Sequence, residues 1–248
     1  MRDTVLKVMA VSFFASIVTT VYADDLTNNF RTHLNERALD VLAKDLGAVM
    51  GGGSFHQGKA LGFPLGFDLG VHVPVVKIQS DNDIIKDDTS RIGVVWGQAE
   101  IGLPARINLI GRIGKVLDAD LVGGGLRLGL FNSSVPGIPS FSVSGLYSEL
   151  DHDFLQVKTV SANAVLSFDV PFIHPYVGAG YDHTTLEPTE EAFVGVPASI
   201  SRDVKGEADG YRAEVGINLS IIPFTYLTIA TGLANGESLY HAGAGIKF

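Results

Sequence analysis

The chain has 248 residues, no cysteine, 18 basic and 27 acidic side chains, and a mean hydropathy of +0.26. The lack of cysteine excludes a small disulfide-stapled fold, and a hydrophobic content of 46% excludes a disordered chain. The acidic balance argues against a nucleic-acid partner. Length alone permits one large domain or two small ones.

The N-terminal 1–23 stretch is typical of a secretory signal peptide. A basic start with Arg2 and Lys7 precedes an apolar run over 8–21, and Ala23 stands where signal peptidase requires a small residue. The rival interpretation, an uncleaved anchor, needs roughly 20 apolar residues to cross a bilayer, and this run is shorter. We predict cleavage after Ala23 and export across an inner membrane.

An amphipathic helix is predicted within residues 26–50. Leu34, Ala38 and Leu42 recur at four-residue spacing among charged residues, and glycines at 51–53 are expected to end the helix. The predicted organisation is therefore a helix with a glycine-rich linker over 24–59, followed by a second unit over 60–248. The apolar face of the helix must pack against a partner, whether the helix plugs the bore of this second unit, lines the bore or rests below it in the periplasm.

From residue 60 to the end, apolar residues alternate with polar or very small ones, which is the period of a β-strand. Between residues 61 and 75, for example, every odd position is apolar. Ten strands are predicted, at 61–75, 95–103, 105–113, 122–130, 141–147, 160–168, 173–181, 211–219, 224–232 and 240–248. The 224–232 segment has the least regular alternation.

Two all-β architectures fit this alternation, a soluble sandwich with an apolar inside and a membrane barrel with an apolar outside. The aromatic residues favour the barrel, because they sort toward the two strand ends as the aromatic belts of a membrane barrel do. One set comprises Phe63, Phe141, Phe168, Phe172, Phe224 and Phe248, and the other Tyr147, Phe154, Tyr181, Tyr211 and Tyr240. The predicted fold is a transmembrane antiparallel β-barrel with an N-terminal amphipathic helix.

The connections between the predicted strands also differ at the two ends. Long polar connections at 79–90 and 186–205 fall on one side, and short turns containing Pro104, Pro171 and Pro223 fall on the other. Longer external loops and short periplasmic turns are the usual asymmetry of outer-membrane barrels. An even strand number returns both ends of the barrel to the periplasm, so we expect the helix on the periplasmic side.

The last strand resembles the C-terminal signal strand of bacterial outer-membrane β-barrel proteins. It ends in Phe248, with Ile246 and Tyr240 in the same phase. The resemblance covers the pattern of residues 60–248 and implies a location in the outer membrane of a Gram-negative cell envelope. It also implies two partners, outer-membrane lipid and the barrel-assembly machinery that reads the terminal strand in that family.

Polar residues in the inward phase are candidates for lining a pore. They are Asp68, His72, Gln98, Glu100, Arg106, Asn108, Arg112, Arg127, His174, Arg212, Glu214 and Asn218. The plainer interpretation is a paired network that fills a narrow barrel, because buried charges are tolerated when they are paired and hydrogen-bonded. The functional interpretation is a restricted path for small solutes.

A catalytic alternative rests on acidic and histidine residues near the predicted external rim, at Asp151, His152 and Asp153 and at Asp182 and His183. Ten-stranded outer-membrane proteases carry Asp pairs and an Asp/His pair at their rim, and this set resembles theirs only in outline. Such residues are also ordinary in solvated loops. We therefore expect no enzyme, and the spacing shows no metal-ligand motif and no cofactor motif.

The sequence thus predicts a porin-like outer-membrane barrel with a structural role or a role in the passive transport of small solutes. The alternatives left open are a hydrolase at the rim and an adhesin that binds through the 79–90 and 186–205 loops.

Overall fold

The computed structural model describes residues 29–248 except 65, 86–89, 117–118 and 198–200. The predicted signal peptide therefore lies outside the described residues. The strands are β1 (Phe67–Lys77), β2 (Arg91–Gly93), β3 (Val95–Leu103), β4 (Ile107–Val116), β5 (Ala119–Phe131), β6 (Pro139–His152), β7 (Leu155–Phe168), β8 (Ile173–Pro188), β9 (Gly206–Leu219), β10 (Thr225–Ala234) and β11 (Glu237–Lys247). Strands dominate because alternating apolar residues suit a sheet with two different faces.

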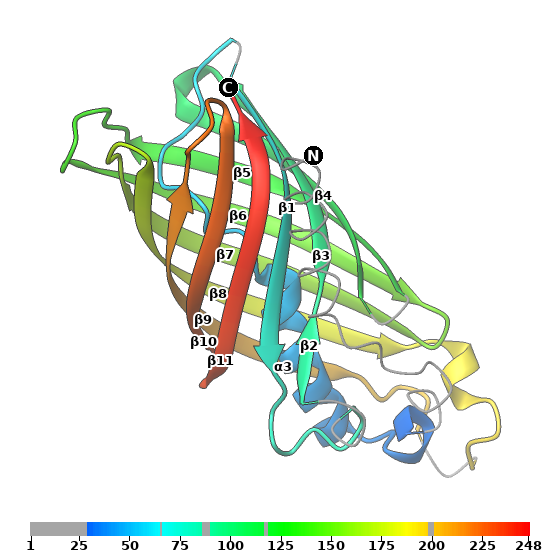
Figure 1. Cartoon of the computed structure of the whole chain (residues 1–248). Helices are drawn as coiled ribbons and strands as arrows, with labels where there is room; N and C mark the ends of the chain where they lie inside the picture. Colours follow the sequence, from blue (N-terminus) through cyan, green and yellow to red (C-terminus); the bar gives the residue numbers. More distant parts are fainter. Residues whose placement is uncertain (1–28, 65, 86–89, 117–118, 198–200) are drawn as a thin grey trace, which may run out of the picture.

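The sheet closes on itself as an antiparallel barrel (Figure 1). Strands β3 to β11 pair in chain order, β1 pairs with β3, and β11 returns to β1 with Asp68 opposite Lys247 and Val76 opposite Leu239. Phe67 and Phe248 extend this seam by exchanging backbone hydrogen bonds of 3.1 and 2.8 Å. Strand β2 only pairs with the end of β1, so ten strands form the wall, which confirms the predicted fold.

The two ends of the barrel differ, and we call them the turn end and the loop end. The turn end carries the 3-10 turn η1 (Pro104–Arg106), the other short connections at 169–172 and 220–224, and the start of β1 beside Phe248. The loop end carries the long connections after β1 and β8, and the second includes the 3-10 turn η2 (Glu190–Phe193). The predicted asymmetry of loop lengths is confirmed.

The outer face of the wall is apolar, as a membrane-spanning barrel requires. Ile113, Tyr211 and Ile229 are 69%, 69% and 58% exposed, whereas their polar neighbours along the strands point inward and are buried. Exposed aromatic residues gather at the turn end, where Phe248 stacks on Phe67 and Phe224 at ring-centroid distances of 4.6 and 4.7 Å. This is the arrangement of side chains that the alternation predicted.

One member of the predicted aromatic belts is misplaced. Phe154 is buried, 3% exposed, because it closes the loop end from inside and packs against Phe30 at 5.0 Å between ring centroids. Its position in a tight connection between β6 and β7, instead of within a strand, breaks the period-two rule that assigned it outward.

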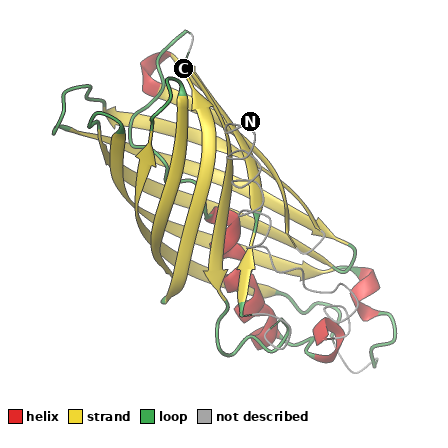
Figure 2. Cartoon of the chain, in the orientation of Figure 1, coloured by secondary structure: helices red, strands yellow, loops and turns green. Residues whose placement is uncertain are grey.

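The single long helix described, α3 (Glu36–Gly51), lies inside the barrel at the loop end (Figure 2). It begins later than the predicted 26–50 helix, because Asn35 adopts an extended backbone and its side chain accepts a hydrogen bond from the Ala38 backbone N–H. The helix was expected at the end with the short turns, whereas α3 lies at the loop end, opposite Phe248. None of the helices described is long and apolar enough to cross a bilayer.

After α3 the chain runs through the inside of the barrel to the turn end, where β1 begins (Figure 1). Residues 61–66 were predicted as part of the first strand, but β1 starts only at Phe67. Leu61 is buried, and its backbone N–H donates to Asn108 Oδ1 inside the barrel. We call residues 36–61, which comprise α3 and the extended stretch that follows it, the lumen segment.

Candidate functional site: the occupied lumen

The loop-end half of the lumen is an apolar socket for α3. Leu42, Leu46 and Val49 are at most 1% exposed, and they share one core cluster with the wall residues Trp96 and Leu186. An amphipathic helix is stable in such a site because its backbone groups are bonded within the helix and only its side chains need partners. The apolar face seen in the sequence therefore finds its partner in the wall.

The contact between α3 and the wall is close at one point. A Cβ on Gly47 would lie 2.1 Å from Thr184 Oγ1, so only glycine allows the helix to reach β8. Thr184 Oγ1 is itself 3.0 Å from Thr159 Oγ1 on β7. The absence of a side chain at position 47 thus sets the depth of the helix against the wall.

The turn-end half of the lumen is polar and holds the extended part of the lumen segment by its backbone. Arg112 donates to the carbonyl oxygens of Met50 and Gly52 at 3.2 and 2.6 Å. Arg127 donates to the Ser54 carbonyl at 3.1 Å. Each guanidinium therefore satisfies carbonyl groups that no helix or sheet satisfies.

The same pattern continues toward the turn end. Asn218 donates to the His56 carbonyl, and Ser167 Oγ accepts from the Gly58 backbone N–H at 3.0 Å. Asn132 and Asn108 accept from the next N–H groups of the lumen segment, at 3.1 and 3.0 Å. The wall side chains thus supply both hydrogen-bond donors and acceptors along the extended part of the lumen segment.

Two of the buried acidic side chains form close ion pairs with arginines on nearby strands. Arg127 lies 2.8 Å from Glu100, and both side chains are fully buried. Arg212 lies 2.5 Å from Asp182 and also donates to Asn163 at 3.0 Å. Such pairs are tolerated in a barrel only with close geometry and further hydrogen bonds, which these have.

Two arginines also lie over aromatic rings. The guanidinium carbon of Arg112 is 4.1 Å from the Trp96 ring centroid, and that of Arg212 is 4.8 Å from the ring of Phe55 on the lumen segment. Phe55 in turn fits against glycines of β8, where a Cβ on Gly178 would lie 2.6 Å from its ring. The arginines thus help to hold the segment through its side chains as well as its backbone.

Most of the predicted pore-lining residues do face the lumen, and the lumen segment covers them. Those that are buried are Asp68, His72, Gln98, Glu100, Asn108, Arg112, Arg127, Arg212, Glu214 and Asn218. His174 is half-buried at the turn end, where its Nδ1 lies 2.9 Å from Asp169. Arg106 was wrongly placed in a strand: it lies exposed in η1 with a positive φ of 61°, because the chain turns there.

The structure does not bring the candidate catalytic residues together. Asp182 points inward to Arg212, whereas His183, the next residue along β8, points outward and lies 2.9 Å from Asp209. Asp151 accepts a hydrogen bond from the exposed side chain of Gln156. His152 packs against Phe154, and the Asp153 carbonyl accepts a hydrogen bond from Thr189. Consecutive strand residues cannot share a face, so Asp182 and His183 form no pair.

Two carboxyl groups outside the strands have opposite pKa shifts. Burial raises the pKa of Asp45 on α3 to about 6, although hydrogen bonds from Asn82 and the Gln79 backbone act in the other direction. Burial alone would also raise the pKa of Asp169 at the turn end, but the Lys59 ammonium, 2.9 Å away, holds it below its usual value. Asp45 tethers the loop after β1 to the helix.

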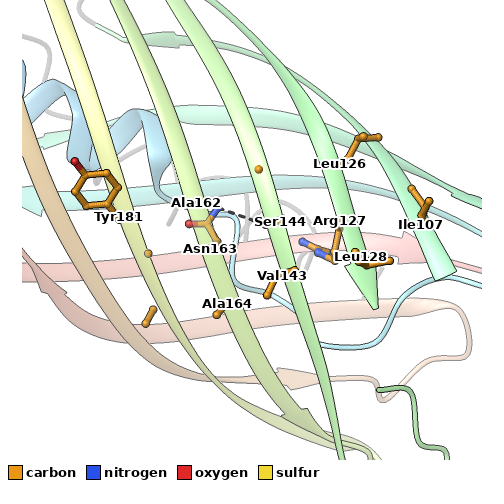
Figure 3. Close-up of a pocket in the computed structure, with 13 residues that line it drawn as sticks. Ile107, Leu126, Arg127, Leu128, Val143, Ser144, Ala162, Asn163, Ala164 and Tyr181 are labelled. Atoms are coloured by element: carbon orange, nitrogen blue, oxygen red, sulfur yellow. Dashed lines mark hydrogen bonds between the residues drawn. The ribbon is translucent and has the colours of Figure 1, made fainter. Parts of the chain in front are cut away.

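Hollows lie both at the mouth of the lumen and on the outer face of the barrel. A cavity of about 440 Å³ opens at the turn end between the lumen segment and the wall, lined by Lys59, Lys247 and Phe224 among others. A wider depression of about 670 Å³ lies across β4 to β8 (Figure 3). Small residues such as Ala162 line part of this depression. Leu126 beside them points outward and is half exposed, so the depression lies on the membrane-facing side of the wall. Within the described ranges no cluster of side chains has metal-binding geometry.

A helix that plugs the bore was one of the alternatives left open by the sequence, but the buried extended stretch after α3 was not predicted. Glycines at 51–53 and 58 indicated a linker, but Phe55, His56 and Gln57 between them are buried against the wall. A flexible linker has no need of a large aromatic side chain in its middle, so Phe55 was the available signal.

No family model and no curated protein matches the chain. Solved structures similar to it include Neisserial surface protein A (14% identity, TM-score 0.36, covering 73% of this chain and 97% of that one). The attachment invasion locus protein Ail of Yersinia pestis has 10% identity and a TM-score of 0.37, over 74% of this chain and 99% of that one. The KdgM porin has 9% identity and a TM-score of 0.38, over 73% and 99%. Likeness at this level assigns no role to the chain.

Proposed function

We propose that this protein is an outer-membrane β-barrel that its own lumen segment seals, with a structural role in the envelope and a loop end that faces outward. The observation that carries the proposal is the hydrogen bonding of the lumen segment: wall side chains bind its backbone from Met50 to Leu61. A passive diffusion channel would need this segment to leave, and bonds to charged donors each contribute roughly 1.5–3 kcal/mol.

The apolar outer face and the two aromatic zones support placement in a membrane, with lipid as the immediate partner. The terminal strand supports recognition by the barrel-assembly machinery. Tyr240 and Ile246 are exposed on the outer face of β11, and Phe248 ends the seam with β1. We further propose that the protein uses no cofactor and catalyses no reaction, since Asp182 is engaged by Arg212.

The test is conductance in planar bilayers at neutral pH. The wild type is expected to give no channel openings, and a variant lacking residues 29–61 is expected to conduct if it folds. Phe55→Gly is the milder variant, because it leaves the wall intact and removes only the contacts of the Phe55 ring with the β8 glycines and Arg212. Phe172→Leu, whose ring is 66% exposed and does not line the turn-end cavity, is the matched control. Steady openings of the wild type, with heat-modifiable gel mobility showing a folded barrel, would contradict a sealed lumen.

A further inference from the structure

A chain of polar contacts runs over the inner face of neighbouring strands, beside the lumen segment. The Tyr226 hydroxyl donates to Asp68 Oδ1 at 2.7 Å, and its oxygen lies 3.3 Å from His72 Nε2. The other nitrogen of His72, Nδ1, lies 3.2 Å from His241 Nε2. His241 Nδ1 is 3.0 Å from Glu214 Oε1. Four strands, β1, β9, β10 and β11, contribute to this chain.

The chain ends at Tyr176, whose hydroxyl donates to the same Glu214 oxygen at 2.5 Å. Each of the five contacts needs one hydrogen between its two heavy atoms. The two tyrosines supply one hydrogen each, a neutral His72 and a neutral His241 supply one each, and ionised carboxylates supply none. Four hydrogens for five contacts leave one contact between two lone pairs, whichever tautomers are chosen.

The buried charges show the same deficit. Asp68 and Glu214 have no arginine partner, whereas Glu100 and Asp182, the other buried carboxylates of the described strands, are paired with Arg127 and Arg212. The remaining buried arginine, Arg112, is used by backbone carbonyls instead. The two carboxylates therefore have imidazoles, tyrosines and the Gln57 amide beside them in a low-dielectric interior, and an unpaired buried charge is costly.

We propose that the His72–His241 pair holds one bound proton at neutral pH, as the fifth hydrogen of the chain and the counter-charge of its two carboxylates. The ionisable groups that face this pair or its carboxylates are His56 from the lumen segment, Asp68 on β1, Glu100 on β3, Arg112 on β4, Arg127 on β5, Tyr176 on β8, Glu214 on β9, Tyr226 on β10 and Lys247 on β11. Lys247 lies at the open turn end, and its ammonium donates to Gln57.

The proton also bears on the closure of the lumen through His56. The His56 ring is 4.8 Å from that of His72, and its Nε2 is 3.3 Å from the Asp68 oxygen that Tyr226 does not use. Loss of the proton leaves two lone pairs in contact directly beneath the lumen segment. Alkaline pH is therefore expected to loosen this part of the segment.

Histidine ¹⁵N NMR of the folded barrel in detergent tests the proposal, with single histidine-to-asparagine variants used for assignment. The expected result at pH 7.5 is one imidazolium on the His72–His241 pair. Neutral rings at both positions in the wild type would overturn the proposal. The measurement is independent of conductance, so it separates this proposal from that of a sealed lumen.

Tyr226→Phe is the diagnostic variant. Without that hydroxyl the remaining three contacts of the chain need three hydrogens, and neutral side chains supply all of them. The hydrogen-bonding demand for the extra proton is then gone, although the two carboxylates remain, and the fraction of imidazolium on the pair at pH 7.5 should fall. Tyr181→Phe, which removes an exposed hydroxyl bonded to Asp209, is the matched control and should change nothing. An unchanged titration in folded Tyr226→Phe would overturn the proposal.

Discussion

The two halves of the lumen hold one continuous segment by different chemistry. At the loop end α3 meets an apolar wall around Trp96, and at the turn end the extended stretch meets a polar wall around Arg112 and Arg127. The difference follows from the backbone: a helix satisfies its own N–H and C=O groups, and an extended segment inside a barrel cannot. The polarity of each half of the wall therefore matches the conformation of the segment that it holds.

The largest effect is expected from breaking a charge pair in the polar half. Arg127→Ala leaves Glu100 buried without its partner and frees the Ser54 carbonyl. The free energy of unfolding should fall by about 3–5 kcal/mol, measured by urea titration in lipid vesicles. Lys115→Ala, which breaks an exposed pair with Asp120, is the control and should cost roughly 1 kcal/mol or less. Equal losses in both variants would show that the polar half is not held by its buried pairs.

A pH titration of stability should distinguish the two ends of the barrel, because the contributions of Asp45 and Asp169 change with pH in opposite directions. The pKa of Asp45 is raised from 3.8 to about 6, so its contribution to stability is full below pH 4 and is lost as the pH rises through 6. The loss is of the order of 3 kcal/mol. The pKa of Asp169 is lowered, so its contribution is present above pH 4 and is lost as the pH falls further.

Variants assign each slope to its residue. Asp45→Asn should remove the decline between pH 4 and 7, seen as thermal melting or as hydrogen exchange of the loop after β1. Asp169→Asn should leave that decline in place and reduce only the loss at lower pH. A decline that persists in folded Asp45→Asn would assign it to another group.

The smallest expected effect concerns the fit of α3 in the apolar half. Gly47→Ala places a methyl group against Thr184 Oγ1 and should cost about 1–3 kcal/mol through overpacking. Thr184→Ala in the same chain should restore most of the loss, as a double-mutant cycle of unfolding free energies would show. Additive losses would mean that the helix is not seated on β8 at this point.

The wall of the barrel could be predicted from the sequence because its information is local. Alternation along the regular strands assigned Ile113 and Leu126 outward and Glu100 and Arg127 inward, and the structure agrees. The same rule would also have separated Asp182 from His183, since neighbours along a strand face opposite sides. The candidate catalytic pair was thus open to doubt from the periodicity alone.

The lumen segment could not be predicted in the same way, because what holds it is not local. Arg112 and Gly52 are 60 positions apart, and Asn218 and His56 are 162 apart. Amphipathicity showed that α3 needs an apolar partner, but both a periplasmic surface and an apolar socket inside the barrel meet that need. Only closure of the sheet identifies the partner.

The seam between β1 and β11 has a consequence for biogenesis. It joins the first and last long strands of the barrel around a segment that has already passed from one mouth to the other. A sheet can enclose a chain this closely without threading it through a closed barrel only if the sheet curls around a chain that is already in place. The lumen segment, which precedes the strands in the chain, would then be in place first, and the later hairpins would close around it. Pairing of the final hairpin with β1 would complete the barrel.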